Sequence, residues 1–398
     1  MSDKQVTQFS PEGPPVFANW HAKLRGLEPI CIYEYPLLTD ARIIAEATQG
    51  YGPYKFLNPI ALRDSPGLVR PGIILRFENF LPFTRPDFSQ TDAEYYHGGE
   101  LADEIAALVS LCLGIRLKAG GSTRRFDQTG DPWGSPTADY RPAPIITLKS
   151  QQLVLPNVVG VRSLIDLLPL QCIPLLSPED LIAFIRAARL YQDALWISES
   201  EPALSWIMFV SAVEACARQW EASTSSPLER LKASKPDVTK RLYEVGGDSL
   251  VEEIANMIVD SLGATKNFID FVLKHMPPPP DKRPPEFGQI AWSKTGMKKI
   301  LQKVYSYRSK ALHGGKPFPA PMCEPPSYLT EGGAPLEKPT VGSAIYMRGG
   351  TWMAKDVPIL LHTFEYITRS ALLEWLKNIE KPKNSMQATA KDDCCIDS

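Results

Sequence analysis

The sequence predicts an α+β protein in which an N-terminal mixed α/β domain, residues 1–176, precedes an all-helical bundle, residues 177–380. In the first half, short β-branched and aromatic runs lie between prolines and glycines, as strands do. In the second half, apolar residues recur every three or four positions, which is the helical period. A length of 398 residues fits two domains that each bury a core. The polar residues 381–398 predict a disordered tail.

The first half contains three predicted strands and two predicted helices. The strands cover residues 30–35, 72–80 and 145–149, where β-branched and aromatic side chains are concentrated. A short helix is expected over 39–48, because a Thr-Asp pair can cap its start and a glycine follows its end. A longer helix is expected over 99–118, where leucine and isoleucine recur at helical spacing before a double glycine.

Residues 118–140 are rich in glycine, aspartate and arginine. One interpretation is a long hairpin or surface loop without a further role. The other is a mobile basic loop in which Arg124 and Arg125 contact phosphate groups.

The second half predicts helices separated by proline-rich connections. A serine cap, a proline at the first helical position and two acidic residues mark the first start, at Ser177. A bend is expected at Gly263, inside the third helix. Prolines at 277–285 and 317–339 stand on either side of the fourth helix. The expected helices cover residues 177–198, 202–220, 248–276, 289–312 and 358–380.

The composition and charge of the chain argue against membrane-spanning, secreted and zinc-binding proteins. The chain has 43 basic and 45 acidic residues, so its net charge gives no general attraction to nucleic acid or membrane. No apolar run approaches the roughly 20 residues that span a bilayer, and the N-terminus lacks a signal-peptide pattern. The seven cysteines are scattered, with no C-x-x-C and no zinc spacing. We therefore expect a reducing, cytoplasmic location. We expect neither attachment to a membrane nor a bound metal or cofactor.

One helix end carries the candidate chemistry. Arg308 occupies a position on the apolar stripe of the predicted helix 289–312, where an unpaired guanidinium would cost several kcal/mol, so it needs a carboxylate or a phosphate. His313 follows five residues later, about 140° around a regular helix. Because Gly314 and Gly315 predict a helix stop, His313 is expected at a frayed end, from which it can turn toward Arg308 or toward the same motif of a second chain. No serine-hydrolase, Walker or dinucleotide motif is present.

Here the sequence resembles a known family. Arg-x4-His at the end of a late helix, within Tyr-x-x-Arg-Ser-x-x-x-His-Gly, is similar to the Apea-like branch of HEPN domains. The apolar segment 206–215, with its Ala-x-Glu-Ala element at Glu214, resembles a second element of that branch. The resemblance covers about residues 177–378 and implies a HEPN-type helical bundle; the first half resembles no family.

The resemblance implies a metal-independent endoribonuclease that works as a homodimer, and so a stress or antiviral defence effector. RNA would be the substrate, and DNA would not, because the attacking group is the ribose 2′-OH. His313 would transfer the proton and Arg308 would bind the phosphoryl oxygens. Two alternatives stay open. In one, the domain binds RNA, nucleotide or protein without chemistry; in the other, Arg308 is a core residue paired with Glu214, and His313 caps the helix end.

Neighbouring residues are candidates for supporting roles. Glu214 is expected to face Arg308 across the bundle as a buried ion pair, and Ser309 to hydrogen-bond the substrate or orient the arginine. Tyr305 and Tyr307 are candidates for base stacking, although packing within the bundle or dimer is the more common use of such residues. Lys310 is a candidate for steering RNA, or a solvated lysine without a role.

Overall fold

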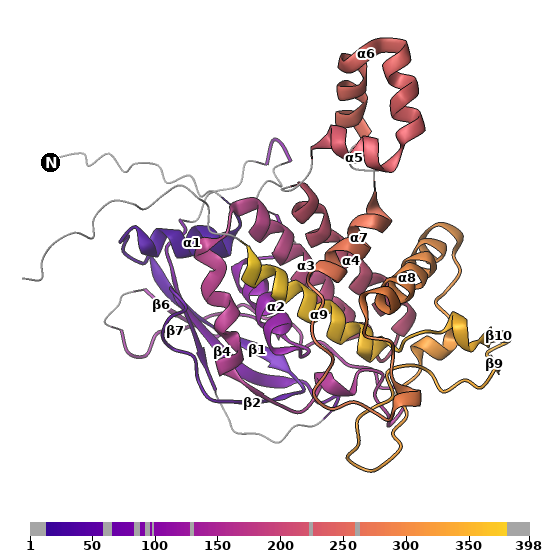
Figure 1. Cartoon of the computed structure of the whole chain (residues 1–398). Helices are drawn as coiled ribbons and strands as arrows, with labels where there is room; N and C mark the ends of the chain where they lie inside the picture. The colour runs from indigo at the N-terminus through magenta and orange to yellow at the C-terminus, as the bar shows by residue number, and fades with distance from the viewer. Residues whose placement is uncertain are drawn as a thin grey trace, which may run out of the picture.

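The structure is a mixed α+β chain, as predicted from the sequence. This computed structural model (Figure 1) is described over residues 13–58, 66–82, 88–91, 96–97, 99–127, 131–222, 226–258 and 263–379. The predicted tail 381–398 lies outside these ranges. Within them, no helix combines the length and apolar character needed to cross a membrane.

The first half is built around one antiparallel sheet. Its long central strands are β1 (Cys31–Thr39) and β4 (Arg70–Asn79), in a register that sets Tyr35 opposite Leu75. The short strands β3 (Tyr54–Leu57), β5 (Lys118–Ala119), β6 (Arg124–Phe126) and β7 (Ser135–Pro136) complete the order β3-β4-β1-β6-β7, with β5 also on β1. Two of the three predicted strands are therefore confirmed, as β1 and β4.

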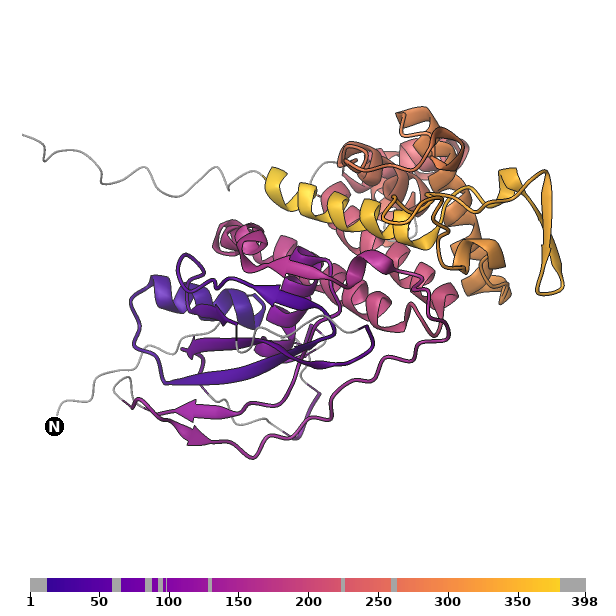
Figure 2. The ribbon, with the colours of Figure 1, turned by 90° about the horizontal axis from the view of Figure 1, so that it is seen from below.

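Helices cover one face of this sheet and form the next layer (Figure 2). Helix α2 (Leu101–Leu113) is buried along almost its whole length and packs against α1 (Pro15–Leu24) and the 3-10 segment η2 (Leu164–Leu175). A capping box between Glu100 and Asp103 starts α2, and Gly114 ends it with a φ of 65°. The helix is thus shorter than the predicted 99–118, because the chain turns at Gly114 to form β5.

The helical half surrounds α4, which packs against four other helices. Ser177 caps the first of them, as predicted, by accepting a hydrogen bond from the Asp180 amide. On α4, the Trp206 ring stacks between Phe318 and Phe364, with ring centroids 5.2 and 4.8 Å away. The helices are α3 (Pro178–Ile197), α4 (Pro202–Ala222), α7 (Ala264–Lys274), α8 (Lys294–Gly314) and α9 (Leu361–Asn378).

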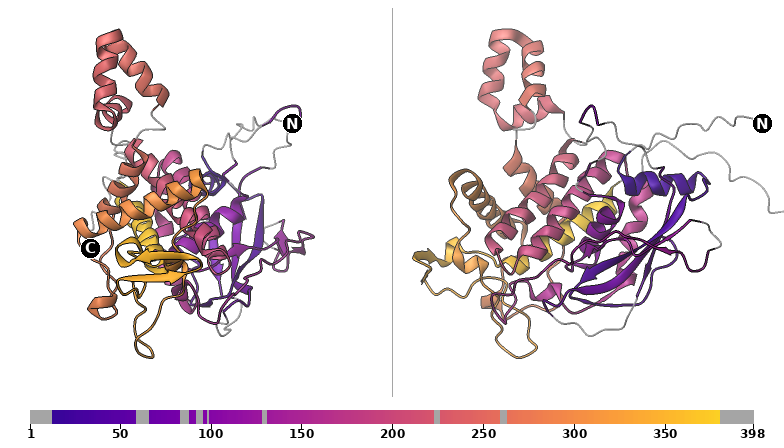
Figure 3. Two further views of the ribbon diagram at one scale, coloured as in Figure 1. Left: turned by 90° about the vertical axis from the view of Figure 1, so that its right-hand side faces the viewer. Right: turned by 180° about the vertical axis from the view of Figure 1, so that it is seen from behind.

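A helical arm projects from this half (Figures 1 and 3). It consists of α5 (Pro227–Ser234) and α6 (Pro236–Ile258), which is broken at Gly247, where φ is 67°. Its small core is separate from the main one and contains Leu231, Val251 and Ala255. The predicted bend at Gly263 within one helix is instead the start of a separate helix: α7 begins directly after Gly263, where φ is 73°. Helix α6 also begins at Pro236 and not at the predicted residue 248.

Smaller elements complete the described chain. The strands β2 (Arg42–Ile44) and β8 (Val161–Ser163) pair in parallel, and β9 (Ala344–Met347) forms a hairpin with β10 (Gly350–Met353). Short 3-10 turns occur at Pro156–Val158, Glu286–Gly288, Ala320–Cys323 and Ala354–Asp356.

Two predicted elements are wrong. Residues 39–48 are not a helix: the Thr39 hydroxyl accepts from the Ala41 amide at the end of β1, and the chain continues as β2. Residues 145–149 are not a strand: prolines precede the segment, Ile145 is 86% exposed, and none of the described strands pairs with it. In both cases the structure of the segment is determined by its contacts in the fold and not by its local propensity.

The main hydrophobic core runs through both halves. Ile105 on α2, Leu181 on α3 and Trp206 on α4 belong to one continuous cluster of buried side chains. The core therefore has no break at residue 176, and the boundary between the two predicted domains stays a prediction.

A buried ion triad joins the two halves. The Arg116 guanidinium donates to Asp40, at 2.9 Å, and to Glu199, at 3.4 Å, and the side chains of Arg116 and Asp40 are fully buried. Asp40 follows β1, whereas Glu199 lies in the turn between α3 and α4. Glu199 also accepts the amides of Val154 and Leu155, at 2.8 and 3.3 Å. The triad thus sets the sheet against the turn from which α4 begins.

We expect Arg116→Met to lower the free energy of unfolding by about 3–5 kcal/mol, because it leaves two carboxylates buried without a cation. Arg76→Met is the matched control, since Arg76 pairs with Glu34 at a partly exposed site, where about 1 kcal/mol or less is expected. Urea unfolding of both variants measures the difference. Equal effects would show that the buried triad contributes no more to stability than the partly exposed pair.

A second prediction concerns Glu104, which is buried on α2 and accepts the Val16 amide at 2.9 Å. Burial raises the pKa of Glu104 to about 8. The folded chain therefore keeps this proton to a higher pH than the unfolded chain, and the free energy of unfolding falls as pH rises from about 4.5 to about 8, by at most about 1.4 kcal/mol per pH unit.

Glu104→Gln removes the titrating group and keeps its shape, so its advantage over the wild type should grow between pH 5 and pH 9. Urea unfolding at pH 5, 7 and 9 measures this difference. Parallel pH profiles for the two proteins would contradict it.

Candidate functional site

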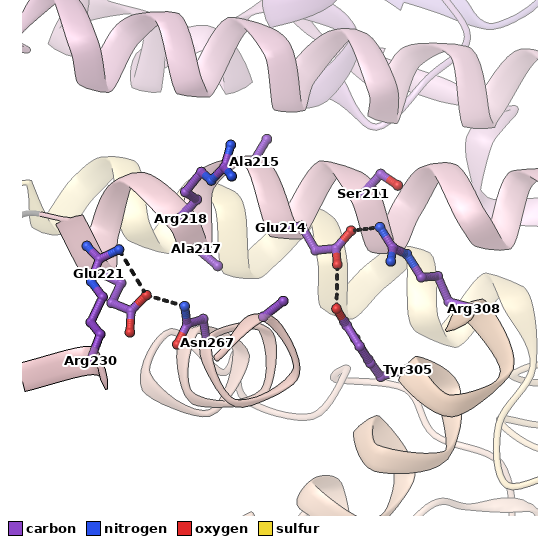
Figure 4. Close-up of a pocket in the computed structure, with 11 residues that line it drawn as sticks. Ser211, Glu214, Ala215, Ala217, Arg218, Glu221, Arg230, Asn267, Tyr305 and Arg308 are labelled. Carbon is purple, nitrogen blue, oxygen red and sulfur yellow. Dashed lines mark hydrogen bonds and ion pairs between the residues drawn. The ribbon is translucent and has the colours of Figure 1, made fainter. Parts of the chain in front are cut away.

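Arg308 lies where α8 faces α4. One of its terminal nitrogens donates to Glu214 Oε2 at 2.5 Å (Figure 4), and the two side chains are each 19% exposed. The predicted pairing of Glu214 with Arg308 is therefore confirmed. The Nε atom of Arg308 is buried and has no hydrogen-bond partner among the described residues.

Tyr305, one turn before Arg308 on α8, completes this arrangement. Its hydroxyl donates to the second oxygen of Glu214, Oε1, at 2.8 Å, and the guanidinium carbon of Arg308 lies 5.6 Å from the centre of its ring. Burial raises the pKa of Glu214, while the hydrogen bond from Tyr305 and the charge of Arg308 oppose that rise. Burial and the adjacent carboxylate raise the pKa of Tyr305 to about 12. Glu214 thus binds two donors and holds the arginine in place.

These residues form one end of a pocket of about 370 Å³ between α4, α5, α7 and α8. At the other end, Glu221 of α4 pairs with Arg230 of α5 at 3.5 Å. It also accepts a hydrogen bond from the side-chain nitrogen of Asn267 (Figure 4). Glu214 and Glu221 are seven residues apart, so they lie on one face of α4 roughly 10 Å from each other. The full lining is Ser211, Glu214, Ala215, Ala217, Arg218, Glu221, Arg230, Ala264, Asn267, Tyr305 and Arg308.

His313 is exposed in the last turn of α8 and does not line this pocket. The helix is regular as far as Gly314, and Gly315 ends it with a φ of 63° and an amide that donates to the Lys310 carbonyl. The helix stop was therefore predicted correctly, but His313 lies before it and not on a frayed end. Five helical residues place it about 140° around the axis from Arg308, so one chain does not bring the two side chains together.

The exposed face of α8 is strongly basic. Between Lys294 and Gly314 the helix has five lysines, one arginine and no acidic residue. Lys303 is paired with Asp356, whereas Lys298, Lys299 and Lys310 are exposed and have no ion-pair partner in the part of the chain that the structure describes. His313 thus lies at one end of a positively charged helix face.

The other candidates near the motif have structural contacts. Tyr305 packs on Phe268, and the Tyr307 hydroxyl donates to the Asp356 carbonyl at 2.6 Å. Lys310 lies 5.6 Å from the centre of the Tyr307 ring, and Ser309 is partly buried. These contacts are what the packing interpretation of the tyrosines predicts; base stacking stays a prediction.

Arg124 and Arg125 are far from this site. They lie on β6, at the opposite side of the molecule from α8 (Figure 1). Arg124 donates to the Gly134 carbonyl at 3.3 Å, and Arg125 pairs with Asp127 at 2.6 Å. The segment forms a hairpin through β6 and β7, and the structure does not bring its arginines to Arg308; contact of Arg124 and Arg125 with phosphate stays a prediction.

The far end of the pocket is not among the residues predicted from the sequence. Arg230 belongs to α5, which lies outside the predicted helices, whereas Glu214, Arg218 and Glu221 recur on α4 at the spacing of one helix face. That spacing was a readable signal. The basic composition of α8 was readable as well. Among the described residues, no group of three or more side chains is arranged to hold a metal ion.

We expect Glu214→Gln to lower the free energy of unfolding by about 1–3 kcal/mol, because it leaves a partly buried guanidinium without its carboxylate. Tyr305→Phe removes only one hydrogen bond and should cost about 0.5–1.5 kcal/mol. Glu244→Gln, in the exposed pair with Arg241, is the control and should change little. Urea unfolding measures all three; a Glu214 variant as stable as the control would show that the carboxylate does not hold Arg308.

No protein-family model matches the sequence, and no curated protein or solved structure matches it either. The similarity to Apea-like HEPN domains therefore rests on the motif residues around Arg308 and Glu214, and it stays a prediction. The function of the site is therefore inferred from its own geometry and charge.

Proposed function

We propose that the protein is a cytoplasmic, metal-independent endoribonuclease of the HEPN type that acts as a homodimer through its helical half. The observation that carries the proposal is the exposed face of α8. It presents His313 at one end of a row of exposed lysines, three of which have no ion-pair partner among the described residues, on a helix with no acidic residue, in a chain whose net charge is −2. A clustered basic face of this kind attracts the phosphate backbone even where the whole chain is not basic.

The residues support a short mechanism. His313 is exposed to substrate and suited to accept the proton of a ribose 2′-OH near neutral pH. The 2′ oxygen then attacks the adjacent phosphorus and the 5′ oxygen leaves with a proton, which gives a 2′,3′-cyclic phosphate and a 5′-OH. Arg308 stabilises the charge that develops on the phosphoryl oxygens. Glu214 and Tyr305 are positioning residues, because they contact the arginine and not the substrate.

The geometry calls for a second chain. Because His313 and Arg308 diverge around α8, a phosphate held by the arginine of one chain would meet the histidine of a second copy. Two copies would supply two histidines, one to accept a proton and one to donate it. Cleavage should therefore be lost when the dimer dissociates.

One observation favours a second candidate, a binding module without chemistry. Three arginines, Arg218, Arg230 and Arg308, line the pocket, and His313 does not. In this candidate a phosphate-bearing ligand binds in the pocket, and the basic face of α8 contributes attraction only. Binding without cleavage by any combination of RNA and conditions would favour it.

The test is RNA cleavage in the presence of EDTA. His313→Ala should lower the cleavage rate by about 100-fold or more, which is the usual contribution of a general acid or base. Its thermal unfolding should be unchanged, because the side chain is exposed. Gln302→Ala, at another exposed position of α8, is the control and should cleave at a rate close to that of the wild type.

One further substrate sharpens the test. An oligonucleotide with a single 2′-deoxy residue at the cleavage position should resist the enzyme, because the nucleophile is missing. Equal cleavage by the wild type and His313→Ala, or loss of wild-type cleavage in EDTA, would contradict the proposal.

A further inference from the structure

The far end of the pocket contains a buried cation whose hydrogen bonding is incomplete. Arg230 is 9% exposed, and its Nε atom is buried without a hydrogen-bond partner among the described residues. Its only described carboxylate contact, with Glu221, is long at 3.5 Å. A buried charged donor without an acceptor costs free energy, and this one belongs to the lining of a pocket large enough for a small ligand.

The start of α7 faces the same space. Ala264, its first residue, and Asn267, in its first turn, both line the pocket. Gly263 precedes the helix and supplies no capping side chain, and the first turn has no acidic residue. The first amides of a helix and its dipole favour an anion at this position.

The donors of the lining favour an anion as well. Three arginines and two glutamates line the pocket. Arg308, at the other end, also has a buried Nε without a partner in the described chain. Each end therefore offers a guanidinium that is held by a glutamate and still has a donor to give. A phosphate group satisfies such donors with two oxygens at once.

We propose that the start of α7, together with Arg230 and Asn267, forms a phosphate-binding site, separate from the proposed His313–Arg308 chemistry and joined to Arg308 by the pocket. The ligand is a compound with more than one phosphate. It is either a strand of RNA, whose next phosphate binds here, or a free polyphosphate compound. The site does not depend on cleavage, because none of its residues takes part in the proposed reaction.

The deciding variant is Ala264→Glu. Ala264 is exposed, and a carboxylate in the first helical turn is favourable for α7, so the variant should fold. That carboxylate would compete for the same amides and for Arg230, and would repel phosphate. Ala264→Gln adds the same bulk without the charge and is the matched control.

Calorimetric titration of the full chain with inorganic pyrophosphate tests the site. The wild type should bind in a saturable way that weakens with salt. Ala264→Glu should weaken binding by about tenfold or more, and Ala264→Gln by much less, since one charge-assisted contact corresponds to about that factor. Arg230→Gln should also lose about tenfold, whereas Arg241→Gln, on the exposed part of the arm, should not.

Two competitors distinguish the sources of phosphate. Displacement of pyrophosphate by a five-residue oligouridylate without terminal phosphates identifies RNA, and displacement by ATP alone identifies a free compound; either supports the site. Equal binding by the Ala264 variants, or no saturable binding of pyrophosphate by the wild type, overturns it. If the protein binds pyrophosphate but does not cleave RNA, only the proposed nuclease activity is refuted, and the phosphate site stands.

Discussion

The buried guanidinium of Arg116 is the constraint on which the arrangement of the site depends. A charge with no access to water must keep its carboxylates within hydrogen-bond distance, so the end of β1 and the turn between α3 and α4 cannot move apart. Because α4 starts three residues after Glu199, the same contact determines where α4 begins. The sheet, which holds none of the candidate catalytic residues near Arg308, thereby helps to position them.

Helix α4 has two different faces, and the difference explains the site. One face packs into the core through Trp206 and its stacked aromatic neighbours. The other carries Glu214 and Glu221, which each hold an arginine from another helix, Arg308 and Arg230 respectively. A partly buried ion pair adds little stability compared with an apolar contact of the same size. Two such pairs along one pocket are therefore consistent with the proposed binding of a phosphate-bearing ligand there.

Sequence reasoning succeeded where one helix determined the answer. The apolar stripe of α8 showed that Arg308 would need a partner, and Glu214 on α4 supplies it. It failed where the answer depended on contacts between distant segments. The start of residues 39–48 has helix-capping side chains, yet Asp40 binds Arg116, 76 residues away. Arg230 has no distinctive sequence context and becomes part of the site only because α5 brings it to Glu221 of α4.

The structure, and not the spacing in the sequence, determines whether His313 and Arg308 can meet in one chain. Spacing alone places Arg308 and His313 in one motif, and a frayed helix end would have allowed them to meet in one chain. The regular last turn of α8 removes that option. If the two residues act on one phosphate, they must come from two chains. A motif that looks intramolecular in the sequence thus becomes an argument for a dimer, and the basic, exposed face around His313 is the surface that a second copy and a bound strand would share. Because like charges on two such faces repel, that assembly would be favoured by the RNA between them.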